Sequence, residues 1–410
     1  MGSFSGCKSH DPSSFSKYAS RPVTLKIYLL AGEPSGDKLG AALMAGLKSL
    51  HPDVAFRGVA GPLMQSEGME SLFPMDELSV MGIAEVLPKY PELKRRLRET
   101  AQDCLDWEPD ALLTIDSPDF SLRLAKLVRQ SAGTRTIHYV APSVWAWRPG
   151  RAEKMADHID HVLALLPFEP RYMEEAGMVC DFVGHPVVAE PQATAEEAEA
   201  FRTTEGLGDA PVILVLPGSR RAEVSRLGPI FGEALRPVLA KTPNARVVVP
   251  AAAPVAYAVK QATAKWPGDP IVLDPRGDST AADRKRAAFR AADVALAASG
   301  TVSLELAAAG TPMVIAYDMN WLSWQIMSRM ARVDTVTLVN LVAGRKAVPE
   351  FLGPACKPAF IGAAISTLLT DDAARRDQIA AMNETMEKLG RGGEAPGLRA
   401  AHAVLERLGR

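Results

Sequence analysis

Residues 25–37 read LKIYLLAGEPSGD, an unbroken apolar run that ends in a glycine-containing turn, and a helix-like stretch follows at residues 37–50. A strand of a parallel sheet is covered on both faces, so it is apolar throughout rather than alternating. The same rhythm recurs in the runs FRGVA, DALLTID, TIHYVA, HVLALLPF and CDFVG. This pattern predicts a parallel sheet built from βαβ units.

A second series of apolar runs begins near Pro211 and reads VILVLPGS, ARVVVPAA, DPIVLD, DVALAAS and TPMVIAY. An Ala- and Glu-rich segment, residues 189–208, separates the two series, and the pattern after Pro349 is helical. We therefore expect an α/β protein with two tandem, Rossmann-like, doubly wound domains that face a cleft. The expected parts are a disordered tail (1–21), an N-terminal domain (22–190), a C-terminal domain (191–365) and C-terminal helices (366–410). Ligands of such sheets bind at the carboxyl ends of the strands, so function should be sought in the loops that follow strands.

The composition excludes several classes of protein. Hydrophobic residues make up 47% and charged residues 23% of the 410 positions, which is ample apolar material for a core. The formal net charge of −2 argues against a protein that coats nucleic acid. The cysteines (Cys7, Cys104, Cys180 and Cys356) lie far apart, which argues against a zinc ribbon or a disulfide scaffold and predicts a reducing compartment. No apolar run reaches the ~18 residues that span a bilayer, and residues 1–21 lack the apolar region of a secretory signal.

The loop after the first apolar run carries Gly32, Glu33, Ser35 and Asp37. Its spacing matches neither a GxGxxG nor a Walker A loop, so it predicts no dinucleotide site and no P-loop. Two interpretations are open. The loop is either a strand–helix turn capped by Ser35 or Asp37, or a loop that faces the cleft and contacts substrate.

Two acids follow the run DALLTID, in the motif IDSPDF. A carboxylate at the end of a buried strand is costly unless it is hydrogen-bonded or used, and burial moves its pKa toward that of a general base. Asp119 suits the cap of the following helix, which leaves Asp116 as the candidate base. The alternative is that both acids are structural.

The stretch IHYVAPSVWAWR places Trp145 and Arg148 after another strand. Aromatic faces suit a sugar ring or an acyl chain, and a guanidinium suits a phosphate. The alternative is a packing loop. His138 in this stretch and His185 in FVGHP fit hydrogen-bonded structural histidines better than catalysts.

Two strand–turn–helix loops of the second series predict a diphosphate site. The motif LPGSRRAEV places Ser219 and Arg220 at a helix N-terminus, where N–H groups and a permanent charge attract an anion. The motif ASGTVSLE repeats this arrangement with Ser299, Gly300 and Thr301 in the turn. Glu305, one turn into the second helix, can accept hydrogen bonds from ribose hydroxyls. Each loop alone could be a simple cap, but the two together favour a nucleoside diphosphate.

Motifs of other enzyme classes are missing from the sequence. It has no HExxH, no EF-hand loop, no Cys/His cluster, no DxD pair of the kind that holds a metal on a nucleotide sugar, and no GxSxG elbow. Metalloenzyme and serine-hydrolase interpretations therefore lack support, and we expect no metal and no cofactor.

Nine blocks resemble the bacterial lipid-A-disaccharide synthase family and occur in the family's order. They are AGEPSGDKLGA, LSVMGIAEVLP, IDSPDF, IHYVAPSVWAWR, LPFEP, FVGHP, LPGSRRAEV, LAASGTVSLELA and LVAGRKAVPEFL. The resemblance runs from about residue 26 to about residue 358. Pro34 departs from the family, in which many members carry Ala, but the flanking residues are kept.

The resemblance implies a metal-independent glycosyltransferase of the GT-B type that acts in lipid A biosynthesis. The donor would be UDP-2,3-diacylglucosamine, bound by the C-terminal domain. The acceptor would be 2,3-diacylglucosamine 1-phosphate, bound by the N-terminal domain. The products would be UDP and a β-1,6-linked disaccharide 1-phosphate. The resemblance also implies a cytoplasmic protein, peripheral on the inner membrane and without a nucleic-acid partner, and a homodimer as in some members.

Roles for the candidate residues follow from this resemblance. Asp116 would take the proton of the attacking hydroxyl, with His138 as the second candidate. The leaving diphosphate would be stabilised by Ser219, Arg220, Ser299, Gly300 and Thr301. Further substrate contacts are expected at Glu33, Ser35, Ser143, Trp145, Arg148, Glu305, Asn340 and Arg345.

Two other interpretations fit the same motifs. One is another reaction on the same fold, such as that of a UDP-sugar 2-epimerase. The other is a non-catalytic nucleotide-binding protein at a membrane face, which the presence of Asp116 disfavours.

The segment 78–90 is the candidate for membrane contact, since both expected substrates carry acyl chains. Its apolar residues Val80, Met81, Ile83 and Leu87 precede the basic residues Lys94, Arg95, Arg96 and Arg98. Apolar side chains can enter a bilayer interface while basic ones meet anionic head groups. The alternative is that the apolar residues are ordinary core and the basic run is a solvated helix face.

Overall fold

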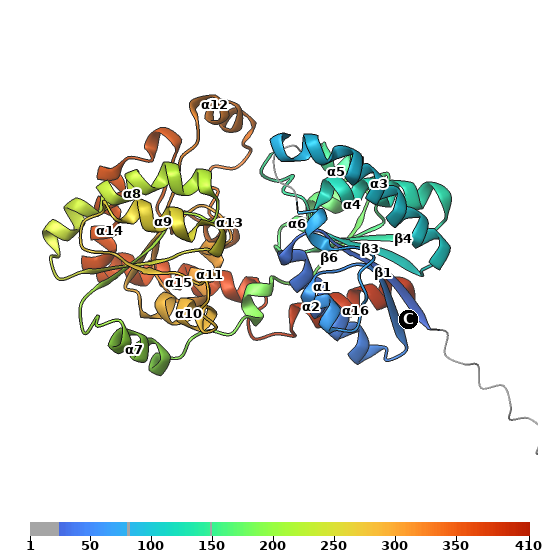
Figure 1. Cartoon of the computed structure of the whole chain (residues 1–410), viewed down its shortest axis with the longest axis horizontal. Coiled ribbons are helices and arrows are strands. Elements are labelled where there is room, and N and C mark those ends of the chain that lie inside the picture. Colours follow the sequence, from blue (N-terminus) through green and yellow to red (C-terminus); the bar gives the residue numbers. More distant parts are fainter. Residues whose placement is uncertain (1–23, 80–82, 148–149) are drawn as a thin grey trace, which may run out of the picture.

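The computed structural model describes residues 24–79, 83–147 and 150–410, and within these ranges the strands form two parallel six-stranded sheets (Figure 1). The first sheet has the order β2-β1-β3-β4-β5-β6 and contains β1 (Leu25–Ala31), β2 (Val54–Val59), β3 (Ala111–Ile115), β4 (Arg135–Tyr139), β5 (His161–Ala164) and β6 (Val179–Phe182). The second has the order β12-β11-β10-β7-β8-β9 and contains β7 (Val212–Leu216), β8 (Arg246–Pro250), β9 (Ile271–Leu273), β10 (Val294–Ala298), β11 (Met313–Tyr317) and β12 (Glu350–Leu352). The predicted α/β architecture of two doubly wound sheets is confirmed.

Helices cover both sheets. Those that follow strands of the first sheet are α1 (Pro34–Leu50), α2 (Pro62–Ser66), η2 (Met75–Glu77), α3 (Ile83–Trp107), α4 (Pro118–Ser131), α5 (Arg151–Ala156) and α6 (Glu169–Glu175). Next come η3 (Pro186–Ala189), α7 (Ala195–Thr204), α8 (Arg221–Lys241), η4 (Ala253–Val255), α9 (Ala256–Thr263), α10 (Ala281–Ala291), α11 (Val302–Ala309), α12 (Trp321–Met330), α13 (Leu338–Ala343), η5 (Gly353–Ala355), α14 (Pro358–Thr370), α15 (Asp372–Lys388) and α16 (Pro396–Leu408). In the described part of the chain, none of these helices combines the length and the apolar character needed to cross a membrane.

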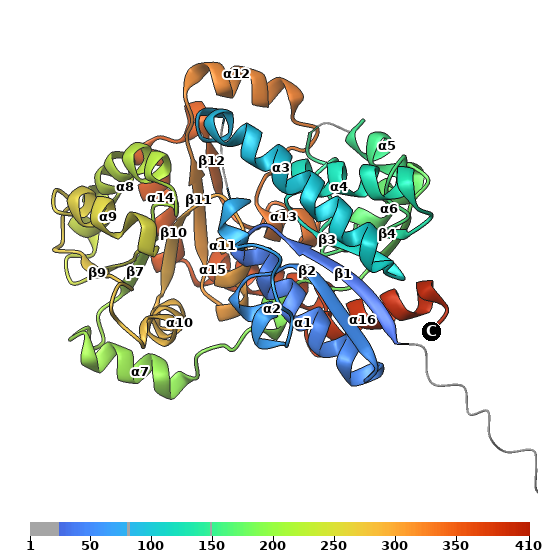
Figure 2. The same cartoon turned by 45° about the vertical axis from the view of Figure 1, so that its right-hand side comes forward.

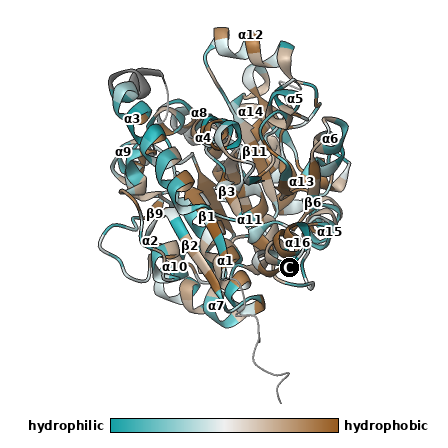
Figure 3. Cartoon of the chain, turned by 90° about the vertical axis from the view of Figure 1, so that its right-hand side faces the viewer, coloured by the Kyte–Doolittle hydropathy of each residue, from teal (hydrophilic) through white to brown (hydrophobic). Residues whose placement is uncertain are grey.

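The apolar runs lie where the sequence predicts, in the middle of the molecule. Every residue of β3, β7 and β10 is buried, because helices lie on both faces of these central strands. Figure 3 shows the strands as apolar and the outer faces of several helices as polar. Cys104, Cys180 and Cys356 are buried and free.

The C-terminal helices divide between the two halves. Helices α14 and α15 pack in the second half, against α8, α11 and α13. Helix α16 instead returns to the first half and packs against α1 (Figure 1), where its apolar face joins the core of the first sheet. The chain therefore crosses twice between the halves. The two crossings are in contact, since the N–H of His185 donates to the carbonyl of Leu389 at 3.1 Å.

Each sheet has one point at which the strand order changes direction. In the first sheet it lies between β1 and β3, and in the second between β7 and β10. The loops after two neighbouring strands diverge at such a point and leave a crevice in which ligands bind. Four of the five predicted loop motifs follow these four strands, so the fold places them at a crevice, whereas the fifth, at residues 143–148, follows β4.

Candidate active site

At the crevice of the first sheet, Gly32 of the loop after β1 and Ser117 of the loop after β3 lie in close contact. A Cβ atom on Gly32 would lie only 2.6 Å from Ser117 Oγ, so a side chain at this position would collide with the loop after β3. The Ser79 hydroxyl donates to the Gly32 carbonyl at 2.7 Å. The loops after β1 and β3, far apart in the sequence, are thus held side by side.

Asp116 stands at the carboxyl end of β3 in a left-handed conformation with a φ of 50°. Ser117 (φ 45°) and Val140 (φ 85°), at the end of the neighbouring strand β4, are also left-handed. Such conformations cost about 1–3 kcal/mol each and cluster at functional sites. The backbone is held by two hydrogen bonds, from the Asp116 N–H to the Tyr139 carbonyl (2.9 Å) and from the Ser121 hydroxyl to the Asp116 carbonyl (2.7 Å). This strain and its anchoring favour a functional rather than a purely structural Asp116.

The environment of Asp116 suits a proton acceptor. Burial raises the pKa of its carboxyl, and the backbone N–H of Ser117 and the Arg151 guanidinium oppose that rise. A carboxylate with a raised pKa is a stronger base than an ordinary aspartate.

Glu33 connects the two halves electrostatically. It lies half-buried at the N-terminus of α1, directly after β1. Burial and then the Asp116 carboxylate raise the pKa of Glu33, whereas Arg220 of the second half lowers it. Glu33 therefore lies within electrostatic reach of both Asp116 and Arg220, a cation of the second crevice.

His138 lies within the first sheet rather than at its edge. It is 1% exposed in β4, and its Nδ1 lies 2.8 Å from Thr114 Oγ1 of β3. Burial lowers the pKa of His138 to about 4. A buried imidazole with such a pKa is a poor proton acceptor, so the structure ranks Asp116 before His138.

The predicted helix caps are wrong. The N-cap position of α1 belongs to Glu33, while Ser35 lies exposed in the first turn. The buried Asp37 instead accepts the N–H groups of Leu63 and Met64, both at 2.9 Å, and so caps α2. Asp119 does not cap α4 either, because Ser117 occupies the N-cap position and the Asp119 side chain is exposed.

The loop 143–147 packs between the halves. Ser143 is exposed. The Trp145 indole lies edge-on against Phe168 at 5.2 Å, and its Nε1 donates to Glu169 at 3.2 Å. Burial raises the pKa of Glu169 to about 7. These contacts fit the packing alternative for Trp145, whose substrate contact stays a prediction, as does that of Arg148, which lies outside the described residues.

The second crevice is a pocket of about 440 Å³. Its lining brings together all the residues predicted around the leaving group, namely Ser219, Arg220, Ser299, Gly300, Thr301 and Glu305. It also contains residues that the sequence did not single out, namely Glu223, Lys285 and the segment 250–252 after β8. The juxtaposition of two phosphate-type loops is that expected of a nucleotide site.

An acid of the following helix, α8, accepts the N–H groups of the loop after β7. Glu223 Oε2 accepts the N–H groups of Ser219 (3.0 Å) and Arg220 (3.2 Å), and Glu223 Oε1 accepts from the Arg220 guanidinium at 3.0 Å. The N–H groups predicted to be free are therefore satisfied. An acid three residues after the N-cap is a capping-box signature, so the sequence did carry a signal for this contact.

The loop after β10 differs from the loop after β7 in the state of its N–H donors. Within the described part of the chain, no protein acceptor pairs with the N–H groups of Thr301 and Val302 at the start of α11. Gly300 has a φ of 152°, which only glycine adopts readily. Further into the pocket, Lys285 Nζ lies 2.6 Å from Glu305 Oε2. We find no local sequence motif that would have identified Lys285.

Two predicted contacts lie away from this pocket. The buried Asn340 amide donates to Thr335 Oγ1 (3.1 Å) and to the Val348 carbonyl (2.9 Å), and it accepts the Val348 N–H (2.8 Å). Arg345 pairs with Asp377 of α15 at 2.9 Å. Neither residue lines the pocket, so their contact with substrate stays a prediction.

The predicted membrane patch falls largely outside the described residues. Val80 and Met81 are not described, and Ile83 and Leu87 begin α3 in a stretch whose side chains are not described. Of the basic residues that follow, Arg96 is held by Glu77 at 2.7 Å and by Glu99 at 2.9 Å. Lys94, Arg95 and Arg98 are exposed.

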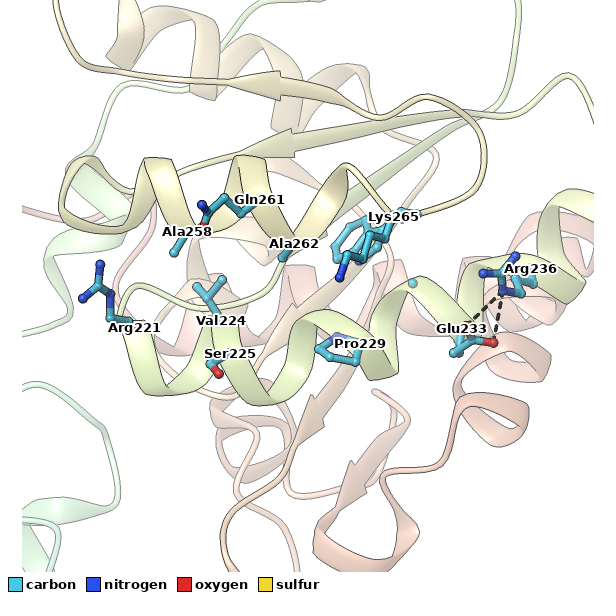
Figure 4. Close-up of a pocket in the computed structure, with 12 residues that line it drawn as sticks. Arg221, Val224, Ser225, Pro229, Glu233, Arg236, Ala258, Gln261, Ala262 and Lys265 are labelled. Carbon is cyan, nitrogen blue, oxygen red and sulfur yellow. Dashed lines mark hydrogen bonds and ion pairs between the residues drawn. The ribbon is translucent and has the colours of Figure 1, made fainter.

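A further groove, of about 710 Å³, lies on the outer face of the second half between α8 and α9 (Figure 4). At one end of the groove α8 approaches the segment after α9 closely, since a Cβ atom on Gly232 would lie 2.4 Å from the Trp266 ring. None of the predicted site residues lines this groove. We therefore place the site at the two crevices.

Comparisons with known proteins identify the relatives of this chain. A model of the family described as lipid-A-disaccharide synthetase matches residues 27–398. The lipid-A-disaccharide synthase of Ruegeria pomeroyi is 65% identical over 94% of this chain and 96% of its own. That of Rhodospirillum centenum is 48% identical, with coverages of 93% and 94%.

Solved structures share the fold at low identity. A UDP-GlcNAc 2-epimerase from Neisseria meningitidis, bound to UDP-GlcNAc, superposes with a TM-score of 0.62 at 12% identity, over 94% of this chain and 98% of its own. MurG from Acinetobacter baumannii superposes with a TM-score of 0.53 at 14% identity, with coverages of 94% and 99%. At such identities the likeness concerns the fold alone.

Proposed function

Because the chain belongs to the lipid-A-disaccharide synthetase family, we propose that it transfers 2,3-diacylglucosamine from UDP-2,3-diacylglucosamine to 2,3-diacylglucosamine 1-phosphate. The products are UDP and the β-1,6-linked disaccharide 1-phosphate. The observation that carries this proposal is the family match over residues 27–398, which includes both crevices.

The geometry supports a single inverting displacement between the two crevices. The acceptor 6-hydroxyl attacks the anomeric carbon, its new C–O bond forms as the bond to the diphosphate breaks, and UDP leaves with the electron pair. The hydroxyl proton passes to the Asp116 carboxylate, whose pKa is raised by burial. Glu33, within electrostatic reach of both Asp116 and Arg220, is positioned to bind an acceptor hydroxyl.

The second crevice stabilises the leaving group. The diphosphate gains charge as the bond breaks, and donors aimed at it favour the transition state over the ground state. The unpaired N–H groups at the start of α11 and the Arg220 guanidinium supply such donors. The diphosphate must compete with Glu223 for Arg220 and for the N–H groups of the β7 loop.

Both proposed substrates are lipids, so we also propose that the protein acts as a cytoplasmic peripheral protein at the inner membrane. The predicted patch of Val80, Met81, Ile83 and Leu87 stays the sequence-based candidate for part of this contact. A homodimer likewise stays a prediction.

A mass-spectrometric assay with both lipid substrates tests the reaction. We expect UDP and the disaccharide 1-phosphate to form together, and omission of the acceptor to abolish the disaccharide. The solved epimerases make a second assay worthwhile, in which UDP-GlcNAc is supplied without acceptor. An altered sugar in that assay, together with no disaccharide in the first, would refute the synthase activity.

A further inference from the structure

Helix α12 exposes an unusual amount of apolar surface. None of its ten residues, all of which the structure describes, is buried. Trp321 is 73%, Leu322 62% and Ile326 51% exposed, and the first two are the most exposed large hydrophobic side chains in the described part of the chain. A cluster of such side chains on one short helix marks an interaction surface rather than chance exposure.

The helix is nevertheless firmly formed and attached. Asn320 Oδ1 accepts the Ser323 N–H at 2.8 Å and caps the N-terminus. Trp324 is the anchor, because the chain at Gly353 passes so close to its ring that a Cβ atom there would lie 2.4 Å from Cδ2. Because Trp324 holds one side of the helix against the protein, Trp321, Leu322 and Ile326 remain exposed to solvent.

The charged residues of α12 and of the two positions after it are basic, and the next acid along the chain, Asp334, is paired with Lys346 at 3.2 Å. Helix α12 contains no acidic residue. Arg329 lies three residues after Ile326, on the same side of a helix, and Arg332 follows the C-terminus, and both are exposed. An apolar strip flanked by arginine is suited to an anionic surface.

Helix α12 and the N-terminus of α3 lie at the same end of the molecule. Figures 1 and 2 show them there, one on each half. Further along α3, Lys94, Arg95 and Arg98 are exposed and add positive charge to this helix. The segment after α12 also reaches the first half, since the Arg332 N–H donates to the Ala146 carbonyl at 3.0 Å.

We propose that α12 is an interfacial anchor that docks on the surface of an anionic lipid bilayer, with Trp321, Leu322 and Ile326 in the interface and Arg329 and Arg332 at the head groups. A protein partner is the alternative occupant, and a stable interface with one would bury about 800 Å² on each side. Trp and Arg are suited to the boundary between head groups and acyl chains. The proposal rests on the proposed function, in which both substrates are lipids.

The test is binding to vesicles, measured by co-sedimentation. The variant Trp321→Ser/Leu322→Ser/Ile326→Ser should bind vesicles of phosphatidylcholine and phosphatidylglycerol at least about tenfold more weakly than the wild type. Arg329→Gln/Arg332→Gln should weaken binding to these vesicles and leave the weak binding to pure phosphatidylcholine unchanged. The matched control is Tyr257→Ser on α9, a side chain that is 60% exposed on another part of the second half.

Folding and catalysis are followed separately. Because the replaced side chains are exposed, the melting temperature and UDP affinity of each variant should equal those of the wild type. Equal vesicle binding by the triple variant and the wild type would overturn the proposal, as would absence of wild-type binding. A change from dimer to monomer in the triple variant, without a change in vesicle binding, would assign the surface to a second copy of the chain. A failed transferase assay beside intact, α12-dependent vesicle binding would reject the proposed function and not the anchor.

Discussion

At the scale of single residues, Asp116 differs from Asp119 in its environment although both acids share one motif. Asp116 is held at a positive φ beside the crevice, whereas the Asp119 side chain is 96% exposed. Asp116→Asn keeps the shape and removes the base, so kcat should fall about 10²–10⁴-fold. UDP affinity should hardly change, and Asp119→Asn is the matched control. Wild-type turnover of the Asp116 variant would reject the assignment and make His138→Ala the next variant to test.

The pH dependence of the wild type checks the same assignment. An acid with a raised pKa loses its basic form as the pH falls through that pKa. The acidic limb of kcat/KM should therefore lie above the usual range of an aspartate, in the direction that burial shifts the pKa of Asp116. An acidic limb at or below that range would contradict the raised pKa.

Lys285 is the second residue for which the structure predicts an effect. Its ammonium pairs with Glu305 in the nucleotide pocket and lies over the Phe289 ring at 5.1 Å. Lys285→Met keeps the stem and removes the charge, so UDP affinity should fall on the order of tenfold, measured by calorimetry. Lys260→Met, which breaks an ion pair with Asp274 outside the pocket, should leave UDP affinity unchanged. Equal affinities of the two variants would remove Lys285 from the nucleotide site.

At the scale of elements, the sequence predicts strands better than helix caps. A strand buried on both faces has to be apolar throughout, and that requirement is visible within a few residues, as in β7. The cap of α2 is not visible in this way, because Asp37 lies 26 residues before Leu63 and comes from another helix. The same holds for Lys285 and Glu305, which are brought together only when α10 and α11 pack. Residue spacing in the sequence indicates contacts within one element or turn, whereas these contacts join residues of different elements and form only when the elements pack.

The cap of α2 yields a stability prediction. Gly61, at its N-cap position, has no side chain, and a Cβ atom there would lie 2.5 Å from Asp37 Cγ, so Asp37 takes over the capping. Asp37→Ala would leave the N–H groups of Leu63 and Met64 without an acceptor. The free energy of unfolding should fall by about 1–3 kcal/mol in urea denaturation. Asp76→Ala, at an exposed acid nearby, should change it by less than about 0.5 kcal/mol.

At the scale of the whole molecule, the order of the sheets explains why the candidate site was largely predictable. Neighbouring loops at a change of strand direction must form a crevice, so motifs after β1, β3, β7 and β10 had to meet in pairs once the strands were ordered. The return of α16 to the first half was not predictable in the same way. Its apolar face would suit either core, and only the packing against α1 decides between them.

The contact between α16 and α1 leads to a prediction about the whole molecule. Gly397 lies so close to α1 that a Cβ atom would stand 2.7 Å from the carbonyl oxygen and 2.8 Å from the Cβ of Ala42. Backbone cannot yield as a flexible side chain does, so Gly397→Ala should lower the free energy of unfolding by about 1–3 kcal/mol. Gly393→Ala is the matched control on the same crossing, since its Cβ would lie 3.4 Å from the Gly390 carbonyl oxygen and meet only ordinary contact. UDP binding, which belongs to the second half, should survive in both variants below their melting temperatures. Equal unfolding of the two variants in urea would mean that α16 does not hold the first half together.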